Sequence, residues 1–302
     1  TMMEPWDGPA SILFSDGDVM GAVLDRNGLR PSRYYITNDG FLILSSEVGV
    51  LEVPEEKIVL KERLHPGKML LVNTVQGKVL NDEEVKEYYA KKQPYGEWLD
   101  SYLVQLKNIK IPNLPVEEYT KEERMRLQKA FGYTYEEYRS SIGKMALNGV
   151  EATASMGIDT PLAVLSHEHQ PLFNYFKQLF AQVTNPPIDC IREEIVTSTS
   201  VYVGRDGNLL EEEPKNCQVL KINNPILTNT DMLKIKNMKV EGFKAVTVPI
   251  TYYKSAPLDR AMDRLFVEVD RAHRAGANIL ILSDRGVDEN HVAIPSLLAV
   301  SA

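Results

Sequence analysis

The sequence predicts a protein in two parts, an antiparallel, β-rich α+β part followed by an α/β part that contains parallel βαβ units. In the first 80 residues, short apolar runs alternate with Asp-Gly and Asn-Gly turns, which supply the positive φ angles that tight hairpins need. A charged stretch interrupted by prolines comes next. Near the C-terminus, an apolar strand, an amphipathic helix and a second apolar strand follow one another, which is the order of a βαβ unit.

Strands and tight turns account for the whole of the first part. No helical pattern separates the strands, so an antiparallel meander is favoured over a βαβ arrangement. The expected strands cover residues 11–14, 19–24, 34–37, 41–44, 57–60 and 68–73.

The turn after the second strand has the sequence Asp-Arg-Asn-Gly-Leu-Arg-Pro. Asp25, Asn27 and Gly28 form a tight turn, and the proline that follows fixes the exit path of the chain. Guanidinium groups can bind an anion or clamp a carboxylate, although the residues alone favour a structural turn with surface arginines. The arginines of this segment are Arg26, Arg30 and Arg33.

A connector is predicted for residues 81–120. Asn81, followed by three acidic residues, indicates the start of a charged helix that runs to Lys92. Pro94, Pro112 and Pro115 then interrupt a polar stretch. The predicted division is therefore 1–80, 81–120 and 121–302.

The second part is richer in helix. Thr134 and Glu137 form a capping box that predicts a helix ending at Gly149. A short strand is expected at 161–166, and a helix with an apolar stripe is expected at 171–183.

The clearest βαβ unit lies near the C-terminus. Its strands are expected at 245–250 and 278–284, and the helix between them is expected to be capped by Ser255 and to end at Gly276. A last helix is expected to begin near Pro295, and the sequence stops within it, which indicates a fragment of a longer chain.

Composition excludes several classes of function. The net charge of −8 argues against general nucleic-acid binding, and no apolar run is long enough to span a membrane. The chain has two cysteines, Cys190 and Cys217, and this low number indicates a reducing, cytoplasmic setting. They lack CxxC spacing, so no metal cluster is expected. The His167-Glu168-His169 run has no further metal ligand at a suitable spacing, and no nucleophile elbow or phosphate loop is present. No catalytic, cofactor-binding or metal-binding residue is therefore predicted.

Two loops contain residues through which backbone can approach a neighbouring domain. Small residues and glycine permit close approach, and paired prolines stop a helix and stiffen the loop after it. The residues alone favour simple connecting loops, and the acidic cluster at 189–194 favours an ion-pair network. The candidate residues are Ser155, Met156, Gly157, Asp159 and Thr160 in one loop, and Asn185, Pro186 and Pro187 in the other.

Taken together, the motifs resemble the large chain of the glutamate synthase family. Several are long, and they occur in order along nearly the whole chain. The matching stretches are 4–10, 25–34, 46–50, 66–72, 130–134, 151–157, 159–166, 174–189 and 281–285.

The resemblance implies a fold and a function. Enzymes of this family hydrolyse glutamine at an N-terminal cysteine and pass ammonia through an internal tunnel to a flavin-bearing barrel, where 2-oxoglutarate becomes glutamate. They use FMN and a 3Fe-4S cluster, and their electrons come from an NAD(P)H-dependent small subunit or from ferredoxin. Residues 1–80 would end a layered αββα class-II amidotransferase domain, and residues 121–302 would form most of the central domain.

The partners implied are the upstream glutaminase part and the downstream FMN barrel of the same chain. The two loops at 153–161 and 184–189 are expected to face the tunnel, while Asp25, Asn27, Gly28 and Arg30 belong to a turn of the family's pattern. A cytoplasmic location is expected, or a plastid one in a plant or alga.

The sequence departs from the family's pattern where chemistry is concerned. It has no N-terminal cysteine, no HNGEIN segment for the oxyanion hole, and no flavin barrel or cluster cysteines. Cys190 stands where the family usually has proline. No catalytic residue is carried over, and this segment is expected to be inactive alone.

Two alternatives remain. One is a free-standing, non-catalytic scaffold or interaction protein built from the same modules. The other is an amidotransferase of the phosphoribosylamine-forming type, which has a similar turn but also needs an acidic strand and loop for phosphoribosyl diphosphate that the sequence lacks.

Overall fold

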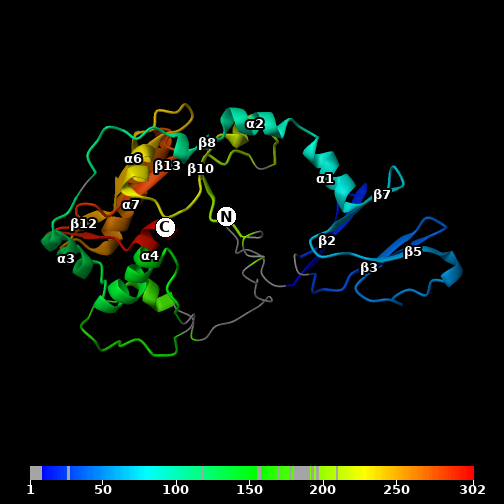
Figure 1. Ribbon diagram of the computed structural model, residues 1–302, viewed down its shortest axis with the longest axis horizontal. Helices are drawn as coiled ribbons and strands as arrows, with labels where there is room; N and C mark the ends of the chain where they lie inside the picture. Colours follow the sequence, from blue (N-terminus) through cyan, green and yellow to red (C-terminus); the bar gives the residue numbers. More distant parts are fainter. Residues whose placement is uncertain are drawn as a thin grey trace. The chain divides into compact units, whose positions relative to one another are not determined.

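The computed structural model divides the chain into two compact units, which are described separately. The first unit runs through Gly96, and the second comprises most of the chain from Glu97 to Ala302 (Figure 1). The structure describes residues 9–25, 28–116, 118–154, 158–168, 170–176, 179, 191, 194, 197–208 and 210–302.

Two antiparallel sheets build the first unit, as the turn pattern predicts. One contains β1 (Ser11–Ser15), β2 (Val19–Leu24), β6 (Met69–Asn73) and β7 (Lys78–Leu80), in the order β1-β2-β6-β7. The other contains β3 (Arg33–Thr37), β4 (Leu42–Ser45) and β5 (Ile58–Arg63), in the order β4-β3-β5. All six expected strands are confirmed, and a 3₁₀ turn at Glu55–Lys57 precedes β5.

The core of the first unit lies between these two sheets. Ala22 and Leu70 are opposite one another on β2 and β6, so their side chains share one face. They are buried with Leu24 and Leu64. Tyr34, Leu42 and Leu44 of the second sheet pack against this cluster. The two sheets therefore pack face to face.

A capped helix, α1 (Asp82–Ala90), follows the first sheet. The Asn81 side chain accepts hydrogen bonds from the N–H groups of Glu83 and Glu84, and Glu84 accepts one from the Asn81 N–H. This reciprocal cap satisfies donors that a helix start leaves unpaired, and it confirms the predicted helix start. α2 (Tyr95–Tyr102) comes next in the chain.

The second unit contains a small mixed sheet. β10 (Val219–Ile222) pairs in parallel with β8 (Val104–Gln105) and antiparallel with β9 (Val201–Gly204). Short 3₁₀ turns lie at Leu106–Asn108 and Pro214–Cys217. The sheet's buried residues join one core cluster with Ile235 and Phe243.

The predicted βαβ unit is confirmed. β11 (Ala245–Pro249) and β13 (Ile279–Ser283) pair in parallel, and α7 (Leu258–Arg274) lies between them in the chain. Gly276, with a φ of +88°, follows the end of α7. β12 (Thr251–Tyr253) and β14 (His291–Ala293) form a separate antiparallel pair, and α8 (Ser296–Ser301) follows.

Helices cover both faces of the β11–β13 pair. Ile279 and Ile281 pack in the cluster that contains Ile235 of α6 (Asn229–Asn237). Val248 and Leu282 pack in the other cluster, which contains Leu265 of α7. Since successive side chains of a strand point to opposite faces, α6 and α7 lie on opposite sides of the pair.

One asparagine fixes the beginning of β13 against the start of β11. The side-chain oxygen Oδ1 of Asn278 accepts a hydrogen bond from the Lys244 N–H at 2.8 Å, and the side-chain Nδ2 donates one to the Gly242 carbonyl at 2.6 Å. At the other end, the Ile250 N–H donates to the Ser283 carbonyl at 2.9 Å. The pair is therefore held at both ends.

The segment between α2 and β9 carries short helices. α3 spans Lys121–Ala130, and a π-helical turn at Glu137–Ile142 continues into α4 (Gly143–Asn148). Thr134 and Glu137 cap this helix reciprocally, and Gly149 ends it with a φ of +63°. Both predicted ends are confirmed.

Three expectations require correction. The strand predicted at 161–166 is wrong, because this segment forms turns in which Val164 and Ser166 donate to the carbonyls of Leu162 and Ala163. Val164 and Leu165 are 83% and 93% exposed, so the apolar run has no buried face on which to form a strand.

The two others concern helices. In the helix predicted at 171–183, the described part is a 3₁₀ turn at Leu172–Phe176, closed by the Asn174 N–H to the Pro171 carbonyl, and the remainder lies largely outside the described residues. Ser255 does not cap α7. The Ala256 N–H closes a turn onto the Tyr253 carbonyl, and the helix begins after Pro257, whose ring fixes φ.

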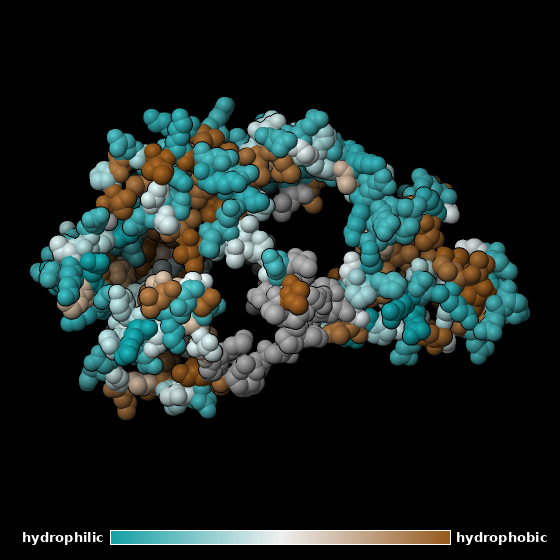
Figure 2. Space-filling view, viewed as in Figure 1, coloured by the Kyte–Doolittle hydropathy of each residue, from teal (hydrophilic) through white to brown (hydrophobic). Residues whose placement is uncertain are grey.

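Both units expose large apolar side chains. Val48, Val50, Leu51 and Val59 are more than half exposed in the first unit, and Figure 2 shows hydrophobic side chains gathered over the sheet of β3 and β5. Leu147, Val164 and Leu165 are at least 80% exposed in the second. Among the described helices, none combines the length and apolar character needed to cross a membrane.

Candidate functional site

The Asp-Arg-Asn-Gly turn is attached to the loop before β6. The Asp25 carbonyl accepts hydrogen bonds from the N–H groups of Gly28 and Gly67, at 3.1 and 3.0 Å. Gly28 has a φ of +61°, and a Cβ there would lie 2.6 Å from Cγ of Pro66. Glycine is required both by its backbone conformation and by this close approach. Arg26 and Asn27 lie outside the described residues.

The other two arginines of this segment are exposed. Arg33 begins β3 and is directly opposite Arg63 of β5. Like charges in this position repel one another across a sheet. The described contacts bring neither Arg33 nor Arg30 to a carboxylate, so the described residues of this turn assemble no catalytic group.

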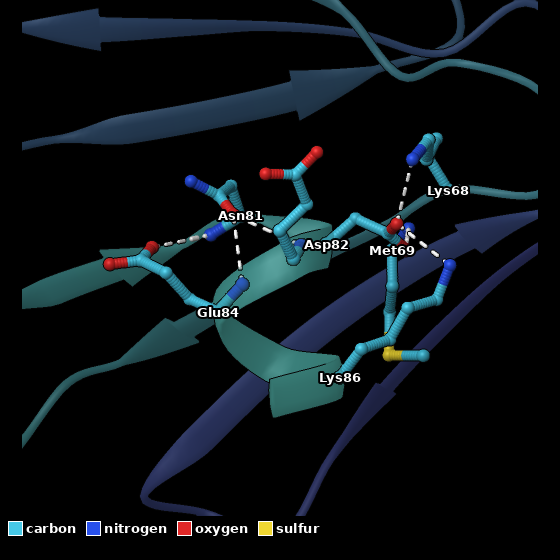
Figure 3. Close-up of polar contacts among 7 residues, drawn as sticks. Lys68, Met69, Asn81, Asp82, Glu84 and Lys86 are labelled. Atoms are coloured by element: carbon cyan, nitrogen blue, oxygen red, sulfur yellow. Dashed lines mark hydrogen bonds and ion pairs between the residues drawn. The ribbon is translucent and has the colours of Figure 1, made fainter. Parts of the chain in front are cut away.

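A buried carboxylate holds the start of α1 against β6. Asp82 accepts hydrogen bonds from Lys68 and Lys86 at 2.9 and 2.8 Å and from the Met69 N–H at 3.2 Å, as Figure 3 shows. The two lysines and this N–H hold the pKa of Asp82 at about 2, since each favours the charged form. Asp82 in turn raises the pKa of Lys68. The site is fully paired and serves to position α1.

The candidate tunnel loops are only partly described. Asp159 and Thr160 are exposed and belong to irregular backbone before Pro161. Ser155, Met156 and Gly157 lie outside the described residues, as do Asn185, Pro186, Pro187, Cys190 and most of the cluster at 189–194. The role of both loops stays a prediction.

The second unit has a hollow at the carboxyl end of β13, with a volume of about 690 Å³. We call it the β13 hollow. Its walls are one face of α3 and the loop that follows β13, from Asp284 to Asn290. The carboxyl ends of parallel strands are where α/β proteins commonly bind ligands. A smaller hollow of about 290 Å³, between β13 and α6, also reaches Asp284 and Arg285.

Arg285 connects the two walls of the β13 hollow. Its guanidinium donates to the Tyr119 hydroxyl at 2.7 Å and lies 5.4 Å from the centre of the tyrosine ring. The two residues are 166 positions apart in the sequence. A hydrogen bond and a cation–π contact therefore join the connector before α3 to the loop after β13.

Two carboxylates of the hollow are occupied by structural hydrogen bonds. Glu123 accepts from the N–H and hydroxyl of Thr120, both at 2.8 Å, which lower its pKa. Asp288 accepts from the N–H groups of Asn290 and His291 and contacts the His291 ring at 2.9 Å, and these contacts lower its pKa, the Asn290 bond most. These bonds stabilise the start of α3 and the shape of the loop.

The sequence did not single out this hollow. Asp284 directly follows an apolar strand, which is the pattern that places polar groups at a sheet edge, but nothing local indicates that Tyr119 or α3 would lie beside it. Within the described part of the chain, no group of three His, Cys, Asp or Glu side chains is arranged to hold a metal ion.

Comparisons with known proteins match both parts of the chain. A family model described as class-II glutamine amidotransferases matches residues 1–98, and one described as the glutamate synthase central domain matches residues 126–302. The NADPH glutamate synthase large chain of Bacillus subtilis is 46% identical over 306 residues, covering 100% of this chain and 20% of that protein.

Other relatives have comparable similarity. Ferredoxin-dependent glutamate synthase 2 of Synechocystis is 42% identical, with 100% of this chain and 20% of the relative covered. The NADH glutamate synthase of Schizosaccharomyces pombe is 41% identical, with 99% of this chain and 15% of the relative covered. The chain thus spans a fifth or less of the length of these curated relatives.

Replacing Gly28 with alanine is expected to destabilise the first unit more than replacing Gly40. Both glycines have positive φ, so each variant carries a backbone cost of about 1 kcal/mol. Nothing lies within 4 Å of a Cβ at Gly40, whereas at Gly28 the contact with Pro66 adds about 1–3 kcal/mol of overpacking. Urea unfolding of the two variants measures the difference, and equal losses would contradict the steric argument.

Substituting Asp82 with asparagine is expected to lower the free energy of unfolding by up to about 2 kcal/mol at pH 7. Because the folded pKa of about 2 lies below the unfolded value, the stabilisation is present above about pH 4 and is lost as pH falls toward 2. In urea unfolding, the difference in free energy of unfolding between wild type and variant should fall at pH 3 to roughly half of its value at pH 7.

The control is Glu87→Gln, which removes an exposed i,i+4 pair with Lys91. This change should cost less than about 0.5 kcal/mol. If the loss of free energy of unfolding in Asp82→Asn were the same at both pH values, the stabilising role assigned to the Asp82 charge would be refuted.

Proposed function

The chain belongs to the glutamate synthase family, and from this premise we propose that it bridges the two reaction centres of a glutamate synthase large chain. In this proposal, glutamine is hydrolysed by residues upstream of the chain, and 2-oxoglutarate is converted to glutamate by residues downstream. The segment itself supplies a walled route for ammonia and no catalytic group.

The observation that carries the proposal is the extent and order of the similarity. The relatives match 99% or more of this chain, and the amidotransferase match precedes the central-domain match. The N-terminal segment of the first compact unit ends at Gly96, close to residue 98, where the amidotransferase match ends. The finer division at residues 80 and 120 stays a prediction.

The exposed apolar surfaces support a bridging role. Isolated soluble proteins rarely expose large contiguous apolar patches, and such patches often contact another protein surface. Leu147, Val164 and Leu165 in the second unit, and the apolar residues between β4 and β5 in the first, are large apolar side chains that are mostly exposed. In the proposal they contact the remaining parts of the same large chain.

The loops at 153–161 and 184–189 are proposed to face the ammonia route. Closing such a route against bulk water keeps a reactive intermediate from being lost. The exposure of Asp159 and Thr160 supports this placement, because a wall residue of the parent enzyme need not be covered within this segment.

The proposed parent uses FMN and a 3Fe-4S cluster, which transfer the electrons that reductive amination needs. Iron–sulfur clusters are held by sets of cysteine thiolates, and the chain contains two cysteines, far apart in sequence. These residues do not fit a cluster site, so the cluster is assigned to another part of the parent, and FMN is assigned in the proposal to the downstream barrel. The electron source would be an NAD(P)H-dependent small subunit or ferredoxin.

The cellular location follows from the same proposal. It is cytoplasmic, or plastid if the chain comes from a plant or alga. The relatives from rice and spinach are named as chloroplastic.

The purified chain is expected to lack both half-reactions. Incubated with glutamine, or with glutamine, 2-oxoglutarate and a chemical reductant, it should release glutamate no faster than buffer. A full-length glutamate synthase assayed in parallel shows that the conditions support turnover. A glutaminase rate above background from the chain alone would overturn the proposal that this segment supplies no catalytic group.

In a full-length glutamate synthase that carries this segment, Thr160→Trp is expected to uncouple the two reactions. A bulky side chain in the route would let ammonia escape, so glutamine hydrolysis should exceed glutamate synthesis at least twofold, measured as free ammonia. Lys254→Trp, at an exposed polar side chain that is distant in sequence, is the control and should keep the ratio of the parent. Unchanged coupling in Thr160→Trp would remove this residue from the route.

A further inference from the structure

We propose that the β13 hollow binds a free α-amino acid, with its carboxylate at Arg126 and its ammonium group at Asp284 and Glu289. Neither the family matches nor the bridging role assigns a ligand to this place. The inference is independent of the ammonia route, since no residue that lines the hollow belongs to the loops at 153–161 and 184–189.

The position and size of the hollow suit a small ligand. It lies at the carboxyl end of β13, the edge at which open α/β sheets bind ligands. Its volume of about 690 Å³ falls within the range of about 300–1,000 Å³ found for small-molecule sites. The Tyr119–Arg285 contact fixes one side of it.

The lining divides into an apolar and a polar part. Leu127 and Ala130 of α3, with Phe131 and Val287, supply apolar surface. Charged groups of α3 and of the loop after β13 supply the rest. Ligand pockets typically combine apolar walls with a few placed polar groups, and the apolar part here can contact the methylene groups of an amino-acid side chain.

The charges decide which ligand fits. The lining contains Arg126 and Arg285 against four carboxylates, those of Glu123, Asp284, Asp288 and Glu289, so its formal charge is negative. A simple anion would be repelled overall, whereas a group with both signs can be satisfied at both ends. An α-amino acid has a carboxylate and an ammonium group attached to the same carbon.

The side chains assigned to the ligand are those that the described hydrogen bonds and ion pairs leave available. Glu123 and Asp288 already accept hydrogen bonds from Thr120, Asn290 and His291. In the described part of the chain, no hydrogen bond or ion pair within the standard distances engages Asp284 or Glu289. Arg126 acts on Glu123 only as a nearby charge, so its donors can point to a carboxylate in a bidentate manner.

The test is titration calorimetry of the 302-residue chain with L-glutamine, L-glutamate and 2-oxoglutarate. Glutamate and 2-oxoglutarate differ only in replacement of the ammonium-bearing carbon by a keto carbon. We expect one molecule of amino acid bound per chain, and at least tenfold weaker binding of 2-oxoglutarate. Replacing Arg126 with methionine should weaken amino-acid binding at least tenfold.

The control is Arg124→Met, on the same helix but outside the lining of the hollow; it should change binding less than twofold. Urea unfolding of both variants checks that the fold is retained. Absence of binding at 10 mM amino acid, equal binding of 2-oxoglutarate, or equal effects of the two methionine variants would each overturn the proposal. The coupling ratio of the full-length enzyme tests the ammonia route separately, so the two proposals can fail independently.

Discussion

Packing of the parallel β11–β13 pair against a helix on each face is the constraint on which the second unit depends. Ile279 and Ile281 face the cluster with α6, while Val248 and Leu282 face the cluster with α7. With a helix on each face, polar groups of the following loop gather at the carboxyl end of the pair. The loop from Asp284 to Asn290 leaves the carboxyl end, and both hollows beside β13 open where that loop begins.

The first unit has a different organisation. Its core lies between two antiparallel sheets, and its single described helix after the sheets, α1, is held by the carboxylate of Asp82. The tight turn at Gly28 is fixed by backbone hydrogen bonds and by contact with Pro66. In the part of the first unit that the structure describes, these features hold the fold together, and no catalytic group takes part in them.

Local signals in the sequence predicted most of the fold. The caps at Asn81 and Thr134 and the glycine stops at 149 and 276 each rest on interactions within a few residues, so the sequence alone was sufficient. The strand expected at 161–166 failed because an apolar run forms a strand only where another strand or a core can cover it. The β13 hollow was missed because it joins Tyr119 to Arg285, and sequence spacing carries no information about that contact. The candidate loop residues were singled out by their small residues and paired prolines, and their assignment to the ammonia route rests on family resemblance.

The hydrogen bonds of Asn278 have a consequence for how the second unit folds. In a strand with one polar face, slipping by a single residue would expose apolar groups, and this cost selects the pairing. In β13 both faces are aliphatic, so a slipped strand would still bury Ile and Leu side chains on each side. Discrimination between competing pairings must then come from the strand ends, where Asn278 contacts Lys244 and Gly242. The Asn278 amide therefore stabilises the observed register over slipped pairings that the hydrophobic core alone would accept.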